Sequence, residues 1–281
     1  MTTLANVRDD IRNRLVETTA DFYTNAELLV WINYAYRRFI QKTEWLERMR
    51  AQPLVANQYE YTLPSDVTKI VAVRYRDQYD VAPLDMAEWF EYVGTFQSTG
   101  VPTQVYRQFP WDSKIRIYPI PSAASAATTI TGAHNTSVTT ITVGSTTDFP
   151  TRGTLLLNDS EQVRYTAKTA TTFTGCLRGD GGTTAASYAG AETVKWAEIE
   201  VYYTFMPTAL ASDGDVLATP SMFDETIADL TLAIALQKRD KYALAEKHFT
   251  KADEYITKAL EDRTKQNRDK YPNFKDVSME L

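Results

Sequence analysis

The stretch FPTRGTLLLNDSEQVRYTAKTATTFTGCLRG, residues 149–179, alternates apolar and polar positions and is rich in threonine. Such alternation, with glycines between the runs, predicts short β-strands joined by turns. The sequence on either side has a helical period and many aromatic residues. Eight of the chain's eleven glycines fall between residues 122 and 195, and none of its five tryptophans does. We therefore expect residues 122–195 to form an inserted all-β domain.

Strand patterns also border this insert. KIRIYPIP, which ends at Pro121, leads into it, and AEIEVYYTFMP, residues 197–207, follows it. Both runs alternate, which predicts two neighbouring strands of one sheet with the insert grown from their turn. Long insertions at such a place are tolerated because the entropy of loop closure rises slowly with length. Further strands are predicted at QYEYTL, KIVAVRYR and TQVYRQF, with a short helix at residues 84–94.

Two helices are predicted before these strands. The first covers residues 3–18. The second begins at the capping box TNAE, residues 24–27, and runs to about Trp45. Its main apolar face is widened by a second set of apolar residues, beyond the stripe of an ordinary surface helix. That second set is Leu29, Tyr36 and Ile40.

Two more helices are predicted after the strands. PSMFDE opens the first of them, with Ser221 as N-cap and Asp224 at the third helical position. This helix has a main apolar stripe and, on the opposite side, Leu232 and Leu236. The last helix covers residues 241–265 and has a narrower stripe, so one of its faces stays in water. The sequence thus predicts an α+β fold: a bundle of two N-terminal and two C-terminal helices with a small antiparallel sheet (residues 1–121 and 196–265), the insert, and an extended tail (266–281).

Composition excludes several classes of protein. The net charge is −6 with a pI near 5.1, which disfavours tight binding to the phosphates of nucleic acids. No apolar run approaches the ~20 residues of a membrane span, and no signal-peptide pattern opens the sequence. A single cysteine excludes an internal disulfide framework and fits synthesis in a reducing cytoplasm.

Residues with catalytic potential are few, and we predict no catalytic, cofactor or metal site. His134 and His248 lack second ligands at metal-binding spacing, and Cys176 is expected to be a small buried residue. RGDGG, residues 178–182, is expected to be a turn. Asp159 and Glu161 occupy alternate positions on a predicted strand, and we expect both carboxylates to be solvated on one face.

The order of these elements resembles that of a head-to-tail connector adaptor of tailed bacteriophages, also called a head completion protein. The resemblance rests on four stretches outside the insert: YTNAELLVWINYAYRRFIQKTEWL, YEYTLPSDVTKIVAVRYRD, IRIYPIP and VYYTFMPTALASDGDVLATPSMFDETIADLTLAIAL. The insert resembles a small β module of phage structural proteins, on FPTRGTLLLNDSEQVRYT and FTGCLRGDGGTTAASYAGAETV.

This resemblance implies a structural virion protein of the neck, made in the host cytoplasm. It implies a homo-oligomeric ring, usually of twelve copies, with the portal protein above, a tail or stopper protein below, and DNA passing through the centre. Helices that are apolar on two sides need packing partners on both sides, and neighbouring copies in a ring would supply them. We therefore expect a subunit interface at Leu232, Leu236, Leu29, Tyr36 and Ile40.

The tail combines charged residues with apolar ones, which is unusual for a purely solvating end. It lacks the periodicity to order itself alone. The resemblance assigns the C-terminal segment to the portal, so we expect portal binding through Tyr271, Pro272, Phe274, Val277, Met279 and Leu281.

Two other classes of protein stay open on the sequence. A carbohydrate-binding or adhesion protein would use the β insert, although the insert has no tryptophan and only two tyrosines, Tyr165 and Tyr188. An enzyme such as a cell-wall hydrolase would need a catalytic constellation that the sequence does not offer.

Overall fold

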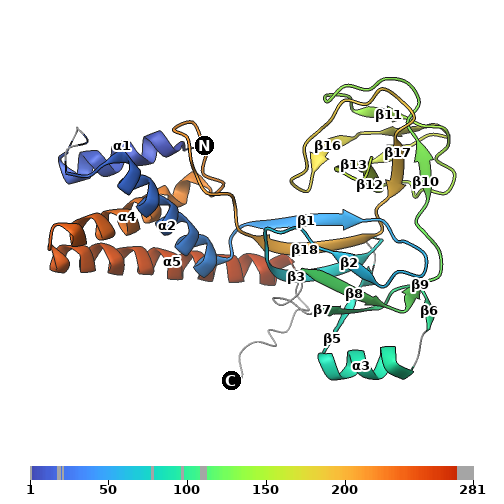
Figure 1. Cartoon of the computed structure of the whole chain (residues 1–281), viewed down its shortest axis with the longest axis horizontal. Coiled ribbons are helices and arrows are strands. Elements are labelled where there is room, and N and C mark those ends of the chain that lie inside the picture. The colour runs from blue at the N-terminus through green and yellow to red at the C-terminus, as the bar shows by residue number, and fades with distance from the viewer. Residues whose placement is uncertain are drawn as a thin grey trace. The chain divides into compact units, whose positions relative to one another are not determined.

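The computed structural model describes residues 2–17, 20, 22–76, 79–95, 98–107 and 113–270. Contacts within the chain divide it into two units. Met1–Leu46 and Met206–Leu281 form the helical unit, and Glu47–Phe205 form the sheet unit. Helices make up the first unit, and the second contains the strands and one short helix (Figure 1). The α+β class that the sequence predicts is confirmed.

The helical unit begins with α1 (Leu4–Leu15) and α2 (Asn25–Thr43). The predicted capping box is present: the main-chain N–H of Glu27 donates to Thr24 Oγ1 at 3.2 Å, and that of Thr24 donates to Glu27 Oε2 at 3.0 Å. α1 ends earlier than predicted because Val16 adopts the left-handed conformation, with φ of 55°.

The other helices of this unit are α4 (Asp224–Lys238) and α5 (Tyr242–Lys270). The prediction of Ser221 as N-cap is wrong. Ser221–Phe223 instead form a 3₁₀ turn, η1, and α4 begins at Asp224 without a side-chain cap. Packing explains the difference, because the Phe223 ring is buried against Phe39 and Trp45, with ring centroids 4.9 and 4.7 Å apart.

α4 is the central helix of the unit. It contacts α1, α2 and α5, and both of its apolar stripes are buried. Thr3, the N-cap residue of α1, forms an isolated antiparallel β-bridge with Val216, in the segment that leads to α4. Within the described residues, none of these helices is both long and apolar enough to cross a membrane.

The sheet unit contains two four-stranded sheets outside the insert. The first has the order β1-β18-β3-β4 and is antiparallel. The second has the order β2-β8-β7-β5, with β5 and β7 parallel. The bounds are β1 (Glu47–Gln52), β2 (Glu60–Thr62), β3 (Val67–Tyr75), β4 (Tyr79–Asp80), β5 (Ala82–Leu84), β7 (Gln104–Arg107), β8 (Lys114–Tyr118) and β18 (Ile199–Phe205).

Three smaller elements complete this part of the unit. β6 (Thr99–Gly100) and β9 (Ile120–Pro121) form a short parallel pair. The predicted short helix is present as α3 (Met86–Thr95). Its Trp89 is buried and stacks on Tyr106, with ring centroids 5.4 Å apart.

The predicted pairing of KIRIYPIP with AEIEVYYTF is wrong, because the two strands lie in different sheets. β8 pairs with β2 and β7, whereas β18 pairs with β1 and β3 on its two edges. β1, which the sequence analysis missed, takes the place that the prediction gave to β8. β18 is buried on both faces, so it is a central strand with no edge left for β8.

Residues 122–195 contribute most of a second pair of sheets, drawn in green to gold in Figure 1. Their orders are β10-β17-β12-β13-β16 and β11-β15-β14. β10 pairs with β17, so the two ends of this segment meet within its own sheet. The bounds are β10 (Ala127–Thr129), β11 (Thr140–Thr142), β12 (Gly153–Leu157), β13 (Glu161–Tyr165), β14 (Ala167–Lys168), β15 (Thr172–Thr174), β16 (Leu177–Asp180) and β17 (Thr193–Trp196).

These strands enclose a hydrophobic core of their own, which includes Leu155, Val163, Phe173 and Val194. They also dock on the edge of β1. The side-chain oxygen of the fully buried Gln162 accepts a hydrogen bond from Ala51 N at 2.8 Å. It thus supplies the acceptor that a neighbouring strand would otherwise offer to β1. That residues 122–195 fold as an independent domain stays a prediction.

Candidate functional site

The five residues predicted for a subunit interface lie in the helical unit. Four of them, Leu232, Leu236, Tyr36 and Ile40, are at most 6% exposed within a single chain. Packing of α4 against α1, α2 and α5 therefore explains the two-sided apolarity that predicted a neighbouring copy. Only Leu29 among the five has surface to offer.

Leu29 is part-buried on α2 and lines a surface hollow of about 300 Å³ together with Leu4 and Ala26. Val30 and Tyr34 lie on another side of the helix, about one turn apart from each other. Val30 is 64% exposed and Tyr34 is 54% exposed. We call Val30 and Tyr34 the α2 patch. Exposed apolar side chains that cluster in this way are typical of contacts with other proteins.

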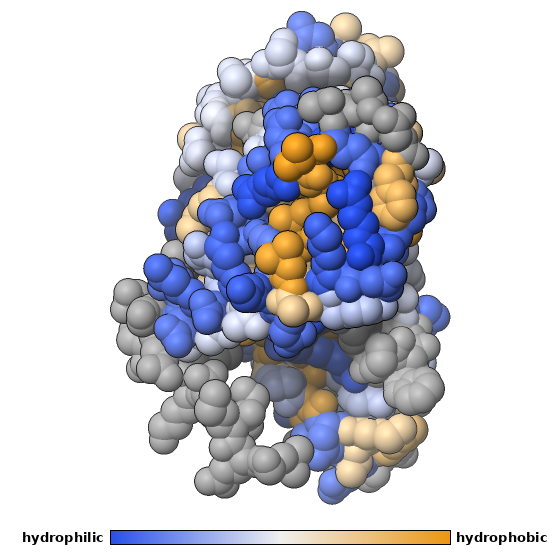
Figure 2. Space-filling model, turned by 90° about the vertical axis from the view of Figure 1, so that its left-hand side faces the viewer, coloured by the Kyte–Doolittle hydropathy of each residue, from blue (hydrophilic) through white to orange (hydrophobic). Residues whose placement is uncertain are grey.

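Figure 2 shows one face of the molecule, on which apolar side chains form a band between hydrophilic ones. Among the described residues of the helical unit, exposed apolar side chains are frequent. They are Val16, Phe22, Val30, Tyr34, Val216, Met222, Tyr242, Leu244, Tyr255 and Leu260.

The connection between α1 and α2 is held by charged side chains. Glu17 is 8% exposed and accepts hydrogen bonds from the main-chain N–H groups of Phe22 and Tyr23, at 2.9 and 2.8 Å. Its second oxygen accepts from Arg239 Nη2 at 2.9 Å, and the Arg239 guanidinium lies 5.0 Å from the Phe22 ring. These bonds tie the connection to the end of α4.

The carboxylates singled out in the sequence are not a solvated pair. Asp159 lies in the turn between β12 and β13 and pairs with Lys195 at 2.7 Å. Glu161 is fully buried, and its two oxygens accept from Arg178 Nε and Nη2 at 2.6 and 2.8 Å. The expected solvation of Glu161 is wrong because its partner lies on another strand, β16.

Further donors surround the Glu161 carboxylate. The main-chain N–H groups of Gly179 and Ala186 and the Tyr188 hydroxyl all lie within 3.1 Å of it. Burial alone would raise the pKa of Glu161, but the bonds from Arg178, Ala186 and Tyr188 hold that pKa below its usual value. The site is a satisfied structural ion pair, and it leaves no oxygen placed for acid–base chemistry.

The bonds between Arg178 and Glu161 also exclude the Arg-Gly-Asp triplet, which begins at Arg178, as a receptor-binding motif. The Arg178 side chain is 5% exposed, so it is not available to a receptor. Cys176 is also buried, and burial raises the pKa of its thiol to about 11. A thiol in this state is a poor nucleophile.

The histidines occupy separate places. His134 accepts a hydrogen bond on Nε2 from Thr142 N at 2.9 Å. His248 Nδ1 lies 3.1 Å from the buried Asp229. Over the described ranges, no three His, Cys, Asp or Glu side chains are grouped to hold a metal ion.

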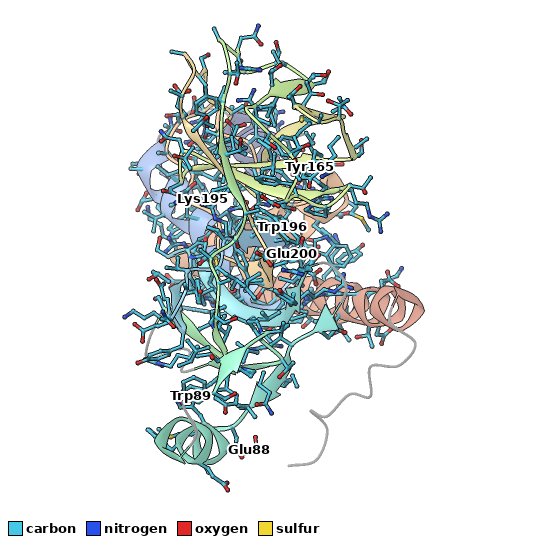
Figure 3. All side chains as sticks on the ribbon, turned by 90° about the vertical axis from the view of Figure 1, so that its right-hand side faces the viewer. Glu88, Trp89, Tyr165, Lys195, Trp196 and Glu200 are labelled. Atoms are coloured by element: carbon cyan, nitrogen blue, oxygen red, sulfur yellow. The ribbon has the colours of Figure 1, made fainter. Side chains whose placement is uncertain are left out.

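Aromatic side chains in the insert do not form a platform for a sugar. All four of them, Phe149, Tyr165, Phe173 and Tyr188, are buried. The nearest tryptophan is Trp196, labelled with Tyr165 and Glu200 in Figure 3. Trp196 lines a hollow of about 480 Å³, but the Arg76 guanidinium lies 4.7 Å from its ring and covers one face of it.

The residues predicted to bind the portal, Tyr271, Pro272, Phe274, Val277, Met279 and Leu281, lie outside the described residues. Sequence reasoning missed Val30 and Tyr34 as surface residues. Their spacing of four residues on the side of α2 away from Leu28 and Ile32 was the available signal.

Comparison with known proteins gives one finding. A family model described as SU10 adaptor protein matches residues 2–273, which include both units and the β insert. No curated protein matches the chain.

Proposed function

This chain belongs to the SU10 adaptor protein family, and from that premise we propose that it is the head-to-tail connector adaptor of a tailed phage. A phage structural adaptor is a virion component that contacts other virion proteins. The finer proposal is a ring beneath the portal, which joins the DNA-filled head to the tail and surrounds the DNA channel. The observation that carries it is the match of one adaptor family across residues 2–273.

We assign the contact between neighbouring copies to the α2 patch. A closed ring uses two different surfaces of each subunit, and an exposed apolar patch is suited to one of them. Val30 and Tyr34 stand out from the helix, whereas the residues beneath them are already buried by the chain's own helices. Replacing them leaves the core of the helical unit intact.

This assignment is tested by sedimentation velocity on the double variant Val30→Glu with Tyr34→Glu. We expect it to keep its helical circular dichroism and to lose the ring. Gln41→Glu is the matched control, because Gln41 is an exposed polar residue of the same helix. A double variant that still forms the wild-type ring would remove the α2 patch from the interface.

We assign portal binding to the tail. Aromatic anchors that become buried in an interface often contribute about 2 kcal/mol or more each. Tyr271→Ala with Phe274→Ala is therefore expected to lower the affinity for portal by more than about tenfold, measured by co-sedimentation. If a chain lacking residues 271–281 binds portal as well as the full chain does, the helices rather than the tail make the joint.

The charge of the chain is consistent with a channel that DNA passes through. With a net charge of −6, the protein lacks the excess of cations that holds phosphates. We expect the purified protein to show no retention of duplex DNA at physiological salt.

A further inference from the structure

The short helix α3 of the sheet unit has apolar side chains on two of its sides. Trp89 is buried and stacks on Tyr106, and it points from α3 toward the strands (Figure 3). Met86 and Phe90 are four residues apart, so they lie next to each other on the helix. They are 54% and 63% exposed. We call Met86 and Phe90 the α3 patch, which no described part of the same chain covers.

The charged residues of α3 and of the residue before it are all acidic. Glu88 and Glu91 are exposed, and the helix contains no lysine, arginine or histidine. Asp85 and Glu88 accept hydrogen bonds from each other's main-chain N–H groups, at 2.7 and 3.1 Å, which leaves both charges uncompensated. No cation among the described residues forms an ion pair with any of these three carboxylates. A protein surface that fits α3 therefore has to bring apolar side chains together with a cation.

The α2 patch has these properties. Arg37 follows Tyr34 by three residues and Val30 by seven, so the three side chains lie on one side of α2. Arg37 is exposed and makes no ion pair or hydrogen bond with any described residue. The one carboxylate of α2 itself, Glu27, is already paired with Lys238 at 2.7 Å. The α2 patch thus combines two exposed apolar side chains with a free cation.

Other pairings of the exposed apolar surfaces are less favourable. The Phe22 and Tyr255 rings each lie near a lysine, at 4.7 and 5.7 Å, whose ammonium already pairs with a glutamate at 2.7 Å. These places offer no free carboxylate to a cation. Contact between two α2 patches would bring arginines together, and contact between two α3 patches would bring only carboxylates together.

We propose that the α2 patch of one copy of this chain docks on the α3 patch of the next copy, with Arg37 at the carboxylates of α3. This inference rests on the proposed ring, for which it supplies the second of the two surfaces that each subunit uses. The apolar side chains are buried in the centre of the contact, and the charges at its rim decide which surfaces meet. Each copy uses its α2 patch toward one neighbour and its α3 patch toward the other.

The test uses two variants of the full chain that each lose one surface. Val30→Glu with Tyr34→Glu removes the α2 patch, and Met86→Glu with Phe90→Glu removes the α3 patch. All four side chains are more than half exposed, so both variants should keep the circular dichroism of the wild type. In sedimentation velocity each variant alone is expected to stay as single copies. An equimolar mixture is expected to form pairs and nothing larger, because each variant supplies the one surface that the other lacks.

Leu177→Glu is the matched control for the α3 patch. Leu177 is 57% exposed and belongs to the same unit but lies on β16, so this variant should form the wild-type ring.

Reversal of charge tests the same contact with its apolar side chains intact. Arg37→Glu and Glu91→Arg should each lower the affinity between copies by at least about tenfold, because like charges then meet. The two substitutions in one chain should restore most of that affinity, because every contact then regains opposite charges.

A ring formed by the α3-patch variant would overturn the proposal. Pairs formed by that variant alone would show that α2 patches bind each other, and a mixture that contains only single copies would show that the two patches do not meet. Charge reversals that fail to compensate each other would refute the placing of Arg37 at the carboxylates of α3. Single copies of the wild-type chain would refute the proposed ring itself, and this contact with it.

Discussion

Glu161→Gln is the substitution whose effect the structure defines most closely. The carboxylate is fully buried and accepts from five donors, two of them on the Arg178 guanidinium. Glutamine keeps the shape of the side chain and one acceptor oxygen. Its amide nitrogen would face groups that donate, and Arg178 would be left as a buried cation without a counter-charge.

The expected loss of stability follows from the burial of the Glu161–Arg178 pair. A pair with side-chain exposures of 5% and 0% cannot be treated as a surface ion pair. Removing one partner of a buried pair costs about 3–5 kcal/mol, because the remaining charge is uncompensated. A typical domain has about 5–15 kcal/mol of stability in total, so we expect Glu161→Gln to remove much of the stability of the β insert.

The assay is hydrogen exchange measured by mass spectrometry on the full chain, read at the amides of β12 and β13. pH provides a second readout. Since the folded pKa of Glu161 lies below its unfolded value, its contribution is present above the usual glutamate pKa and is lost as the pH falls through the folded value. Wild-type protection should therefore fall on acidification, and Glu161→Gln should lack this part of the pH dependence.

Asp159→Asn is the matched control. Its carboxylate is 64% exposed and its pair with Lys195 lies at the surface, so the loss is expected to stay below about 1 kcal/mol. If Glu161→Gln costs no more than Asp159→Asn, the buried network does not hold the insert together.

Three further predictions concern single side chains. Leu232→Glu places a carboxylate at a residue that is 4% exposed, so loss of helical circular dichroism is expected, and a folded protein that only fails to assemble would contradict the packing of α4. Val16 is a β-branched residue at φ of 55° and is 90% exposed, so Val16→Gly should relieve backbone strain without losing a contact. We expect the free energy of unfolding to rise by about 1 kcal/mol and the melting temperature to rise with it. A lower melting temperature would show that the Val16 side chain makes a stabilising contact. Cys176, with a thiol pKa of about 11, should react with iodoacetamide at pH 8 about a hundredfold more slowly in the native chain than after denaturation, and equal rates would show that the thiol is exposed.

Some local signals were read correctly from the sequence, although the N-cap predicted at Ser221 was not among them. The capping box at Thr24 and Glu27 involves residues three apart, and it was identified together with the start of α2. The apolar stripes of α2 and α4 correctly marked buried residues such as Tyr36 and Leu232. What covers those stripes depends on how the helices pack, which periodicity does not reveal.

Strand partners were not predictable in the same way. β1 reads ERMRAQ, and its polar residues hide the short alternation around Met49 and Ala51. Its partners are β18, about 150 residues later, and the side chain of Gln162. Because β1 was not predicted, β8 was assigned as the strand that pairs with β18.

The ion pair of Glu161 was hidden from the sequence in the same way. Glu161 looks like a solvated strand residue until Arg178, on β16, is placed beside it. Its partner is distant in sequence, and no local pattern indicates it.

The central claim, that this adaptor joins the portal to the tail, is tested most directly by electron microscopy of the purified protein mixed with its portal. The account predicts rings of this protein stacked coaxially on one end of the portal, with an open channel through both. Portal particles without added density, beside single copies of this chain that form no ring, would contradict it.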